Sequence, residues 1–197
     1  VHHRVKNNMQ LILSLINLEK DNYEDVNQFS AKLENRIRAM SGVHELLYQS
    51  DSFSSIEMRL FLEKLVSLNQ LIYPQLMVHI DSDEYRLRLD LAVSLALITN
   101  ELIANCAKHG RSTDGSAAVS ITFALEKNRA ALHISDNGPG FPYDFDMTQL
   151  SSFGLVIVET LVKQLHGELE ISNESSGGSV CIRFPKKNEE LNESTNA

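Results

Sequence analysis

The sequence predicts an α+β protein in two parts, a helical hairpin over residues 1–50 and an α/β sandwich over residues 51–186. The hairpin is indicated by residues 1–20 and 25–49, where apolar side chains recur at spacings of three and four across a short polar link. The sandwich is indicated by a long apolar stretch, residues 89–110, among short segments that alternate like strands. These patterns favour helices packed on one face of a mixed sheet.

The hairpin has apolar surface on both helices, and the apolar face of the first is wide enough for partners on more than one side. In the first helix Val5, Met9 and Ile12 follow one face, and in the second Leu33 and Ile37 do so. One hairpin buries only one seam, so we expect a homodimer in which two hairpins form a four-helix bundle. The alternative is that the second part of the chain covers the remaining apolar surface.

Polar residues 50–55 mark the boundary between the two parts. Beyond it we expect, in chain order, a helix at 56–73, a strand at 76–80, the long helix at 88–109, strands at 118–125 and 129–135, a helix at 154–166, and strands at 168–173 and 179–184. Pro74, Gly167 and Pro185 end three of these elements. Residues 141–153 have no clean period, which suggests a mobile loop, and the polar tail 187–197 has the composition of a disordered segment.

Composition narrows the class of protein. A net charge of −8 argues against a general nucleic-acid binder. Cys106 and Cys181, the two cysteines, are expected as buried thiols in a reducing compartment, which favours a cytoplasmic location. We expect no membrane segment, since no apolar run reaches the roughly 18 residues needed to span a bilayer. The chain begins at Val1 inside a helical pattern, so we interpret it as a fragment of a protein that could itself be membrane-attached.

The stretch 89–110 combines an apolar face with polar residues that a surface helix would not need. Asn100 is flanked by apolar neighbours, and Glu101 and Asn105 are four residues apart, so they point the same way. A carboxylate and a carboxamide on one stripe can accept a hydrogen bond from water or ligate a hard cation such as Mg²⁺. An ordinary polar helix face is the alternative.

Three glycine-containing segments are further candidates. Residues 136–140 (DNGPG) follow a strand, and their aspartate could accept a hydrogen bond from an exocyclic amine, although an Asn-Gly hairpin turn is the alternative. Gly154 at a helix start would leave N–H groups free for phosphate, unless Ser151 or Ser152 is simply an N-cap. Residues 177–179 (GGS) suggest a tight turn.

His2 and His3 open the first helix. A neutral imidazole on an exposed helical face can attack phosphorus near neutral pH, whereas two solvated histidines near a chain end are the alternative.

The motifs occur in a recognisable order, namely HHRVKNN at 2–8, HELLYQS at 44–50, NELIANCAKHG at 100–110, DNGPGF at 136–141, SFGL at 152–155 and GGSVCIRFP at 177–185. This order resembles the catalytic core of a two-component sensor histidine kinase, in the subfamily with an HHRVKNN phosphoacceptor box, which is related to kinases with an HRxKN box. The resemblance implies a dimerisation and histidine-phosphotransfer hairpin joined to an ATP-binding domain of the gyrase/Hsp90/kinase/MutL (GHKL, or Bergerat) type.

The resemblance also assigns roles to residues. His3 matches the phosphoacceptor, with His2 as the competing candidate, and Asn105 matches the ligand of the Mg²⁺ that bridges the ATP phosphates. The remaining nucleotide-site candidates are Asn100, Glu101, Lys108, His109, Asp136 as the reader of adenine, Gly138, Gly140, Gly154, Leu155 and Ser179.

The implied activity is autophosphorylation of a histidine from Mg-ATP, followed by transfer of the phosphoryl group to an aspartate on a response-regulator receiver domain. Two features depart from the family pattern. Arg4 follows His3 where many relatives have an acid, so Glu101 becomes the candidate base, and the loop 141–153 contains no Lys or Arg. The alternatives are a phosphotransfer module with a degenerate ATPase domain, a serine kinase or ATPase of the same superfamily, and a dimerisation scaffold.

Overall fold

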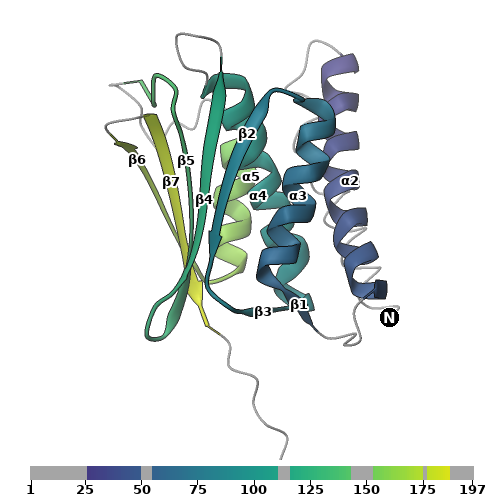
Figure 1. Cartoon of the computed structure of the whole chain (residues 1–197), viewed down its shortest axis with the longest axis vertical. Coiled ribbons are helices and arrows are strands. Elements are labelled where there is room, and N and C mark those ends of the chain that lie inside the picture. Colours follow the sequence, from purple (N-terminus) through teal and green to yellow (C-terminus); the bar gives the residue numbers. More distant parts are fainter. Residues whose placement is uncertain (1–25, 50–54, 111–115, 143–152, 175–176, 187–197) are drawn as a thin grey trace, which may run out of the picture.

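A five-stranded mixed sheet supports the second part of the chain (Figure 1). Its strands, in order across the sheet, are β2 (Leu76–Ser82), β4 (Ala117–Leu125), β5 (Arg129–Asp136), β7 (Gly177–Pro185) and β6 (Glu168–Glu174). β2 pairs parallel to β4, and the other neighbours are antiparallel. A parallel pair needs a long crossover, which a helix between β2 and β4 supplies. This computed structural model describes residues 26–49, 55–110, 116–142, 153–174 and 177–186.

Three helices cover one face of the sheet: α3 (Met58–Ile72), α4 (Leu89–His109) and α5 (Phe153–Gln164) (Figure 1). Alternate residues of the strands face them, as Val119, Ile121 and Phe123 of β4 do, and all three are buried. The prediction of helices on one face of a mixed sheet is thus confirmed.

α4 lies at the centre of the helical layer, in contact with the sheet and with the other helices. Its length and composition would suffice to cross a membrane, so the expectation that no stretch reaches this composition is wrong. However, 78% of its most apolar window is buried inside the fold. A helix that is apolar on nearly all sides fits the interior of a folded domain.

The second predicted hairpin helix, α2 (Val26–Gln49), packs against α3 and α4 (Figure 1). Ala39, Met40 and Val43 are buried in this contact, whereas Ile37 on another face remains 45% exposed. The second part of the chain therefore covers one apolar face of α2. The helix predicted over 1–20 lies outside the described residues.

Two short strands were not predicted. β1 (Ser55–Glu57) pairs antiparallel with β3 (Arg86–Arg88), and Ile56 and Leu87 are buried at their centre. The helix expected from residue 56 therefore begins at Met58. Three-residue strands leave no readable period, and this pair forms between segments about 30 residues apart.

α5 ends in a Schellman motif. The N–H of Gly167 donates to the carbonyl of Val162 at 2.9 Å, and the N–H of His166 donates to that of Lys163 at 3.0 Å. His166 has a φ of 54°, the left-handed region that glycine adopts more readily. The helix predicted over 154–166 therefore ends two residues earlier, at Gln164, and His166 rather than Gly167 adopts the left-handed conformation of the cap.

Candidate functional site

A pocket of about 400 Å³ opens between α4, the end of β5 and the start of β7. Its apolar walls suit a flat ring system, since Leu102 and Leu155 come from helices and Ile134 and Val180 from strands. The remaining lining residues are Asn105, Cys106, His109, Asp136, Pro139, Gly140, Phe141, Pro142 and Gly178.

Asp136 is the charged group of this pocket, and backbone contacts hold its side chain in place. Its Oδ1 accepts hydrogen bonds from the N–H of Gly138 at 2.8 Å and of Gly178 at 3.3 Å. A Cβ on Gly110 would lie 2.5–2.8 Å from the Asp136 side chain, and one on Gly177 would collide with the Asp136 carbonyl. Glycine is therefore required at both positions, and the carboxylate has little freedom to move.

The loop after Asp136 is fastened to β6. The N–H of Phe141 donates to Oδ1 of Asn173 at 2.7 Å, and Nδ2 of Asn173 donates back to the Phe141 carbonyl at 2.9 Å. Gly140 has a φ of 77°, and a Cβ there would lie 2.5 Å from Asn173 Oδ1. The predicted glycine requirement at 140 thus has a physical basis, whereas Asn173 gave no sequence signal because its partner is 32 residues away.

Cys106 lies in the pocket beside Asp136 and is 7% exposed. Burial raises the pKa of this thiol far above its ordinary value, and the charge and hydrogen bonding of Asp136 raise it further. The thiol is therefore a neutral donor toward the Asp136 carboxylate. The prediction of a buried Cys106 is confirmed, but its place in the pocket was not foreseen.

The other end of the site is formed by Glu101, Asn105 and Gly154. A Cβ on Gly154 would lie 2.9 Å from Glu101 Oε2 and 3.8–3.9 Å from the carboxamide atoms of Asn105. The predicted stripe of Glu101 and Asn105 thus faces the first turn of α5, where backbone N–H groups lack helical partners. A carboxamide oxygen here fits Mg²⁺, which typically takes one or two protein oxygens together with waters and phosphates.

Glu101 is also engaged from the opposite side. Nε of Arg36 on α2 donates to Glu101 Oε1 at 2.6 Å, and Arg36 is 1% exposed. Sequence reasoning missed Arg36 because its partner is 65 residues away and α2 was assigned to a separate hairpin.

Lys108 and His109 stand exposed at the end of α4. Although Lys108 is exposed overall, partial desolvation of its ammonium lowers its pKa, and the positive charge of Lys32 lowers that pKa further. Arg36 acts in the same direction, and Glu101 opposes them. The last turn of α4 is therefore a locally positive region.

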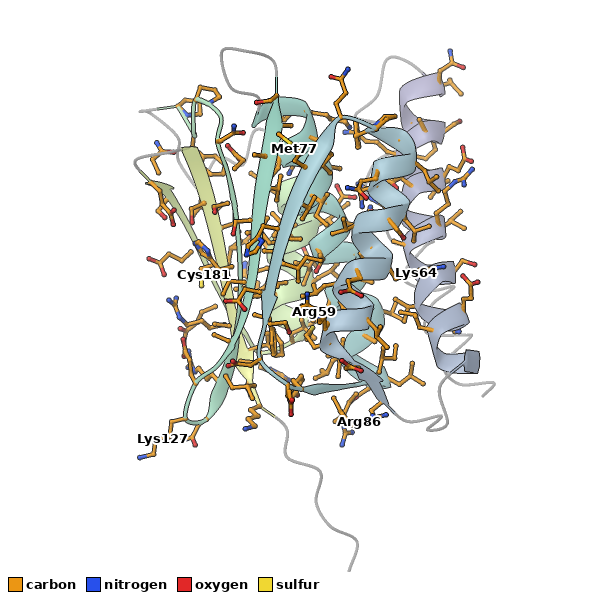
Figure 2. All side chains as sticks on the ribbon, viewed as in Figure 1. Arg59, Lys64, Met77, Arg86, Lys127 and Cys181 are labelled. Atoms are coloured by element: carbon orange, nitrogen blue, oxygen red, sulfur yellow. The ribbon has the colours of Figure 1, made fainter. Side chains whose placement is uncertain are left out.

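Three candidates have other surroundings. Asn100 is completely buried and accepts a hydrogen bond from Nδ2 of Asn69 on α3 at 2.9 Å, away from the pocket lining. The Ser179 hydroxyl lies 2.6 Å from Nε2 of His133, while its neighbours Gly178 and Val180 line the pocket. His3 and most of the loop 141–153 lie outside the described residues. Figure 2 places Cys181 on the sheet, on the side away from the helices.

Comparisons with known proteins agree with this geometry. Residues 1–73 match a family described as "Histidine kinase", and residues 90–188, half of the chain, match "Histidine kinase-, DNA gyrase B-, and HSP90-like ATPase". The chain is 25% identical to blue-light-activated histidine kinase 2 of Erythrobacter litoralis over 196 residues, covering 94% of this chain and 56% of the relative. It is 28% identical to the sensor histidine kinase PdtaS of Mycobacterium tuberculosis over 199 residues, covering 94% and 38%.

Solved structures show the same fold. The histidine kinase domain of the E. litoralis blue-light activated histidine kinase aligns with a TM-score of 0.68 at 18% identity, covering 91% of this chain and 94% of that domain. A longer structure of that kinase aligns with a TM-score of 0.72 at 22% identity, covering 93% and 60%. The chain spans little more than half the length of one curated relative and less than half of the other.

Proposed function

We propose that this chain, which belongs to the histidine kinase-, DNA gyrase B-, and HSP90-like ATPase family, phosphorylates one of its own histidines from Mg-ATP. Its domain order, which is that of a sensor histidine kinase core, supports the proposal. The observation that carries this proposal is the pocket in which the fixed Asp136 carboxylate and Asn105 face one apolar cavity. The expected acceptor is His3, with His2 as its competitor.

Adenine is the base that the Asp136 end suits. Oδ1 of Asp136 is held by two backbone N–H groups, so the carboxylate is a fixed acceptor toward the exocyclic amine of the base. Guanine presents a carbonyl at the corresponding position, which would face the same carboxylate as a second acceptor. Ile134 and Val180 offer apolar contact to the ring.

The triphosphate would extend toward Asn105, Gly154 and Lys108. Bound Mg²⁺ would neutralise charge on the phosphate oxygens, with the Asn105 carboxamide oxygen as its protein ligand. The loop 141–153 contains no Lys or Arg, so Lys108 is the nearby cation on α4.

In the transfer step, the unprotonated nitrogen of the His3 imidazole attacks the γ-phosphorus. A nitrogen–phosphorus bond forms, the bond from phosphorus to the β–γ bridging oxygen breaks, and ADP leaves. The other ring nitrogen keeps its proton, and the ring gains positive charge. The Glu101 carboxylate would stabilise this charge or accept the proton.

The same proposal implies a phosphoryl acceptor, a homodimer and a cellular location. Phosphohistidine would pass its phosphoryl group to an aspartate of a response-regulator receiver domain. Apolar surface left on α2, such as Ile37, would be covered in a homodimer by the partner hairpin. Both activities would take place in the cytoplasm, where ATP is available.

Labelling with γ-labelled ATP and Mg²⁺ tests the proposal. The expected product is an acid-labile, alkali-stable phosphoprotein that His3→Gln abolishes and His2→Gln retains. Label that persists in His3→Gln and disappears in His2→Gln would move the acceptor by one residue. Absence of both label and nucleotide binding by calorimetry would replace the proposal with a phosphotransfer module that has no working ATPase domain.

A further inference from the structure

A buried ion pair joins the two parts of this chain. Arg36 belongs to α2, within the region that matches the first family, and Glu101 belongs to α4, within the ATPase region. Their Nε–Oε1 distance is 2.6 Å, and the side chains are 1% and 11% exposed. Both charged groups are thus largely shielded from solvent, and salt screens such pairs much less than it screens surface pairs.

Stability alone is a weak reason for such a pair. Removing a guanidinium and a carboxylate from water costs several kcal/mol per ion, and apolar residues of similar size often replace a buried pair without loss of stability. Neighbouring contacts of α2 are of that apolar kind, with Ala39, Met40 and Val43 all buried. An ionised pair among them therefore calls for a role that depends on its charge.

The geometry of Glu101 indicates what that role is. Arg36 takes Oε1, and Oε2 faces the first turn of α5, where a Cβ on Gly154 would approach it to 2.9 Å. Asn105, one helical turn further on, borders the same spot. The ion pair thus fixes the carboxylate with one oxygen toward α2 and the other toward the place where the phosphates would lie.

We propose that Arg36 is a positioning residue through which α2 completes the catalytic site of its own chain, by holding the Glu101 carboxylate in a fixed orientation at the phosphate end of the pocket. This inference rests on the proposed histidine kinase activity. Arg36 itself touches Glu101 and acts on the reaction only through that carboxylate.

Arg36→Met and Arg36→Lys test the inference in the full chain. Arg36→Met should lower the rate of autophosphorylation at saturating ATP by up to about 100-fold, because a misplaced catalytic group loses most of its effect. The KM for ATP should stay unchanged, since Asp136 and Asn105 are untouched. Arg36→Lys should restore part of the rate. Arg38→Met is the matched control, because Arg38 is an exposed arginine on the same helix, paired with Glu34.

Glu101→Gln should cost as much as Arg36→Met, and the double variant should cost no more than either single one. If Arg36→Met does not fold, Arg36→Met/Glu101→Met removes both charges and should fold, since an apolar pair can replace a buried ion pair. This double variant should still bind ATP and should label no faster than Glu101→Gln.

Two outcomes would overturn the inference. A wild-type rate in folded Arg36→Met would reduce the pair to an interface contact, and a faster rate would mean that the pair restrains the carboxylate. Neither outcome touches the proposed function, which fails only if the wild-type chain itself neither binds ATP nor becomes labelled.

Discussion

Asp136→Asn separates the charge of the side chain proposed to contact adenine from its shape. The side-chain oxygen of asparagine can still accept hydrogen bonds from the N–H groups of Gly138 and Gly178. These groups now donate to Oδ1 of Asp136, with N–O distances of 2.8 and 3.3 Å. The local fold should therefore survive. The second oxygen, however, becomes an NH₂ group that would face the exocyclic amine of adenine as donor against donor.

The magnitude follows from one charge-assisted hydrogen bond. Such a bond contributes about 1.5–3 kcal/mol. Its loss should raise the dissociation constant about 10- to 150-fold, at 1.4 kcal/mol per tenfold. Isothermal calorimetry should find this loss for ATP and, to the same factor, for adenosine, because in the proposed binding mode the phosphates lie away from residue 136. Asp81→Asn, which changes an exposed aspartate on β2, should bind both ligands like the wild type.

An unchanged ATP dissociation constant in a folded Asp136→Asn protein would refute the assignment of Asp136 to the base. A loss for ATP without a loss for adenosine would place Asp136 at the phosphates instead.

Three further changes test the rest of the site and the C-terminal end of α5. Gly154→Ala should lower the initial labelling rate about tenfold or more, because its methyl group would lie 2.9 Å from Glu101 Oε2; a wild-type rate would show that the carboxylate need not stay there. The pKa of Cys106 in the folded protein is raised above its ordinary value of 9.0. The free energy of unfolding should therefore fall as pH rises above about 9, because the unfolded thiol then loses its proton and the folded one keeps it. Urea titrations at pH 8 and 10 should show a smaller fall for Cys106→Ala than for the wild type. His166→Gly should raise the unfolding free energy by about 1 kcal/mol by relieving a φ of 54°, and an unchanged urea midpoint would contradict this.

Local patterns were sufficient to predict most of the fold. Alternation located β4 and β5, and the three-and-four spacing located α2 and α4, because each pattern repeats over several residues. Ile56 also fitted a helical period, so the three-residue strand β1 was absorbed into the following helix.

Within the site, residues with a local motif were found and those that act across the fold were not. Asp136 and Gly140 belong to one pentapeptide, and both line the pocket. Arg36 and Asn173 act through partners 65 and 32 residues away, which no periodicity marks. Asn100 was predicted as a nucleotide-site residue from its motif position, and its carboxamide oxygen accepts a hydrogen bond from Asn69 inside the helical layer.

The burial of α4 has a consequence for the order in which the protein is made. During synthesis α4 leaves the ribosome before β4, β5 and α5, which contact it in the folded protein, and the sheet that contains β4 and β5 is complete only at Pro185. Until those strands pair, a segment with the length and hydropathy of a membrane span depends on α2 and α3 for cover. The nascent chain is therefore most exposed to aggregation and to chaperones between the synthesis of His109 and that of Pro185.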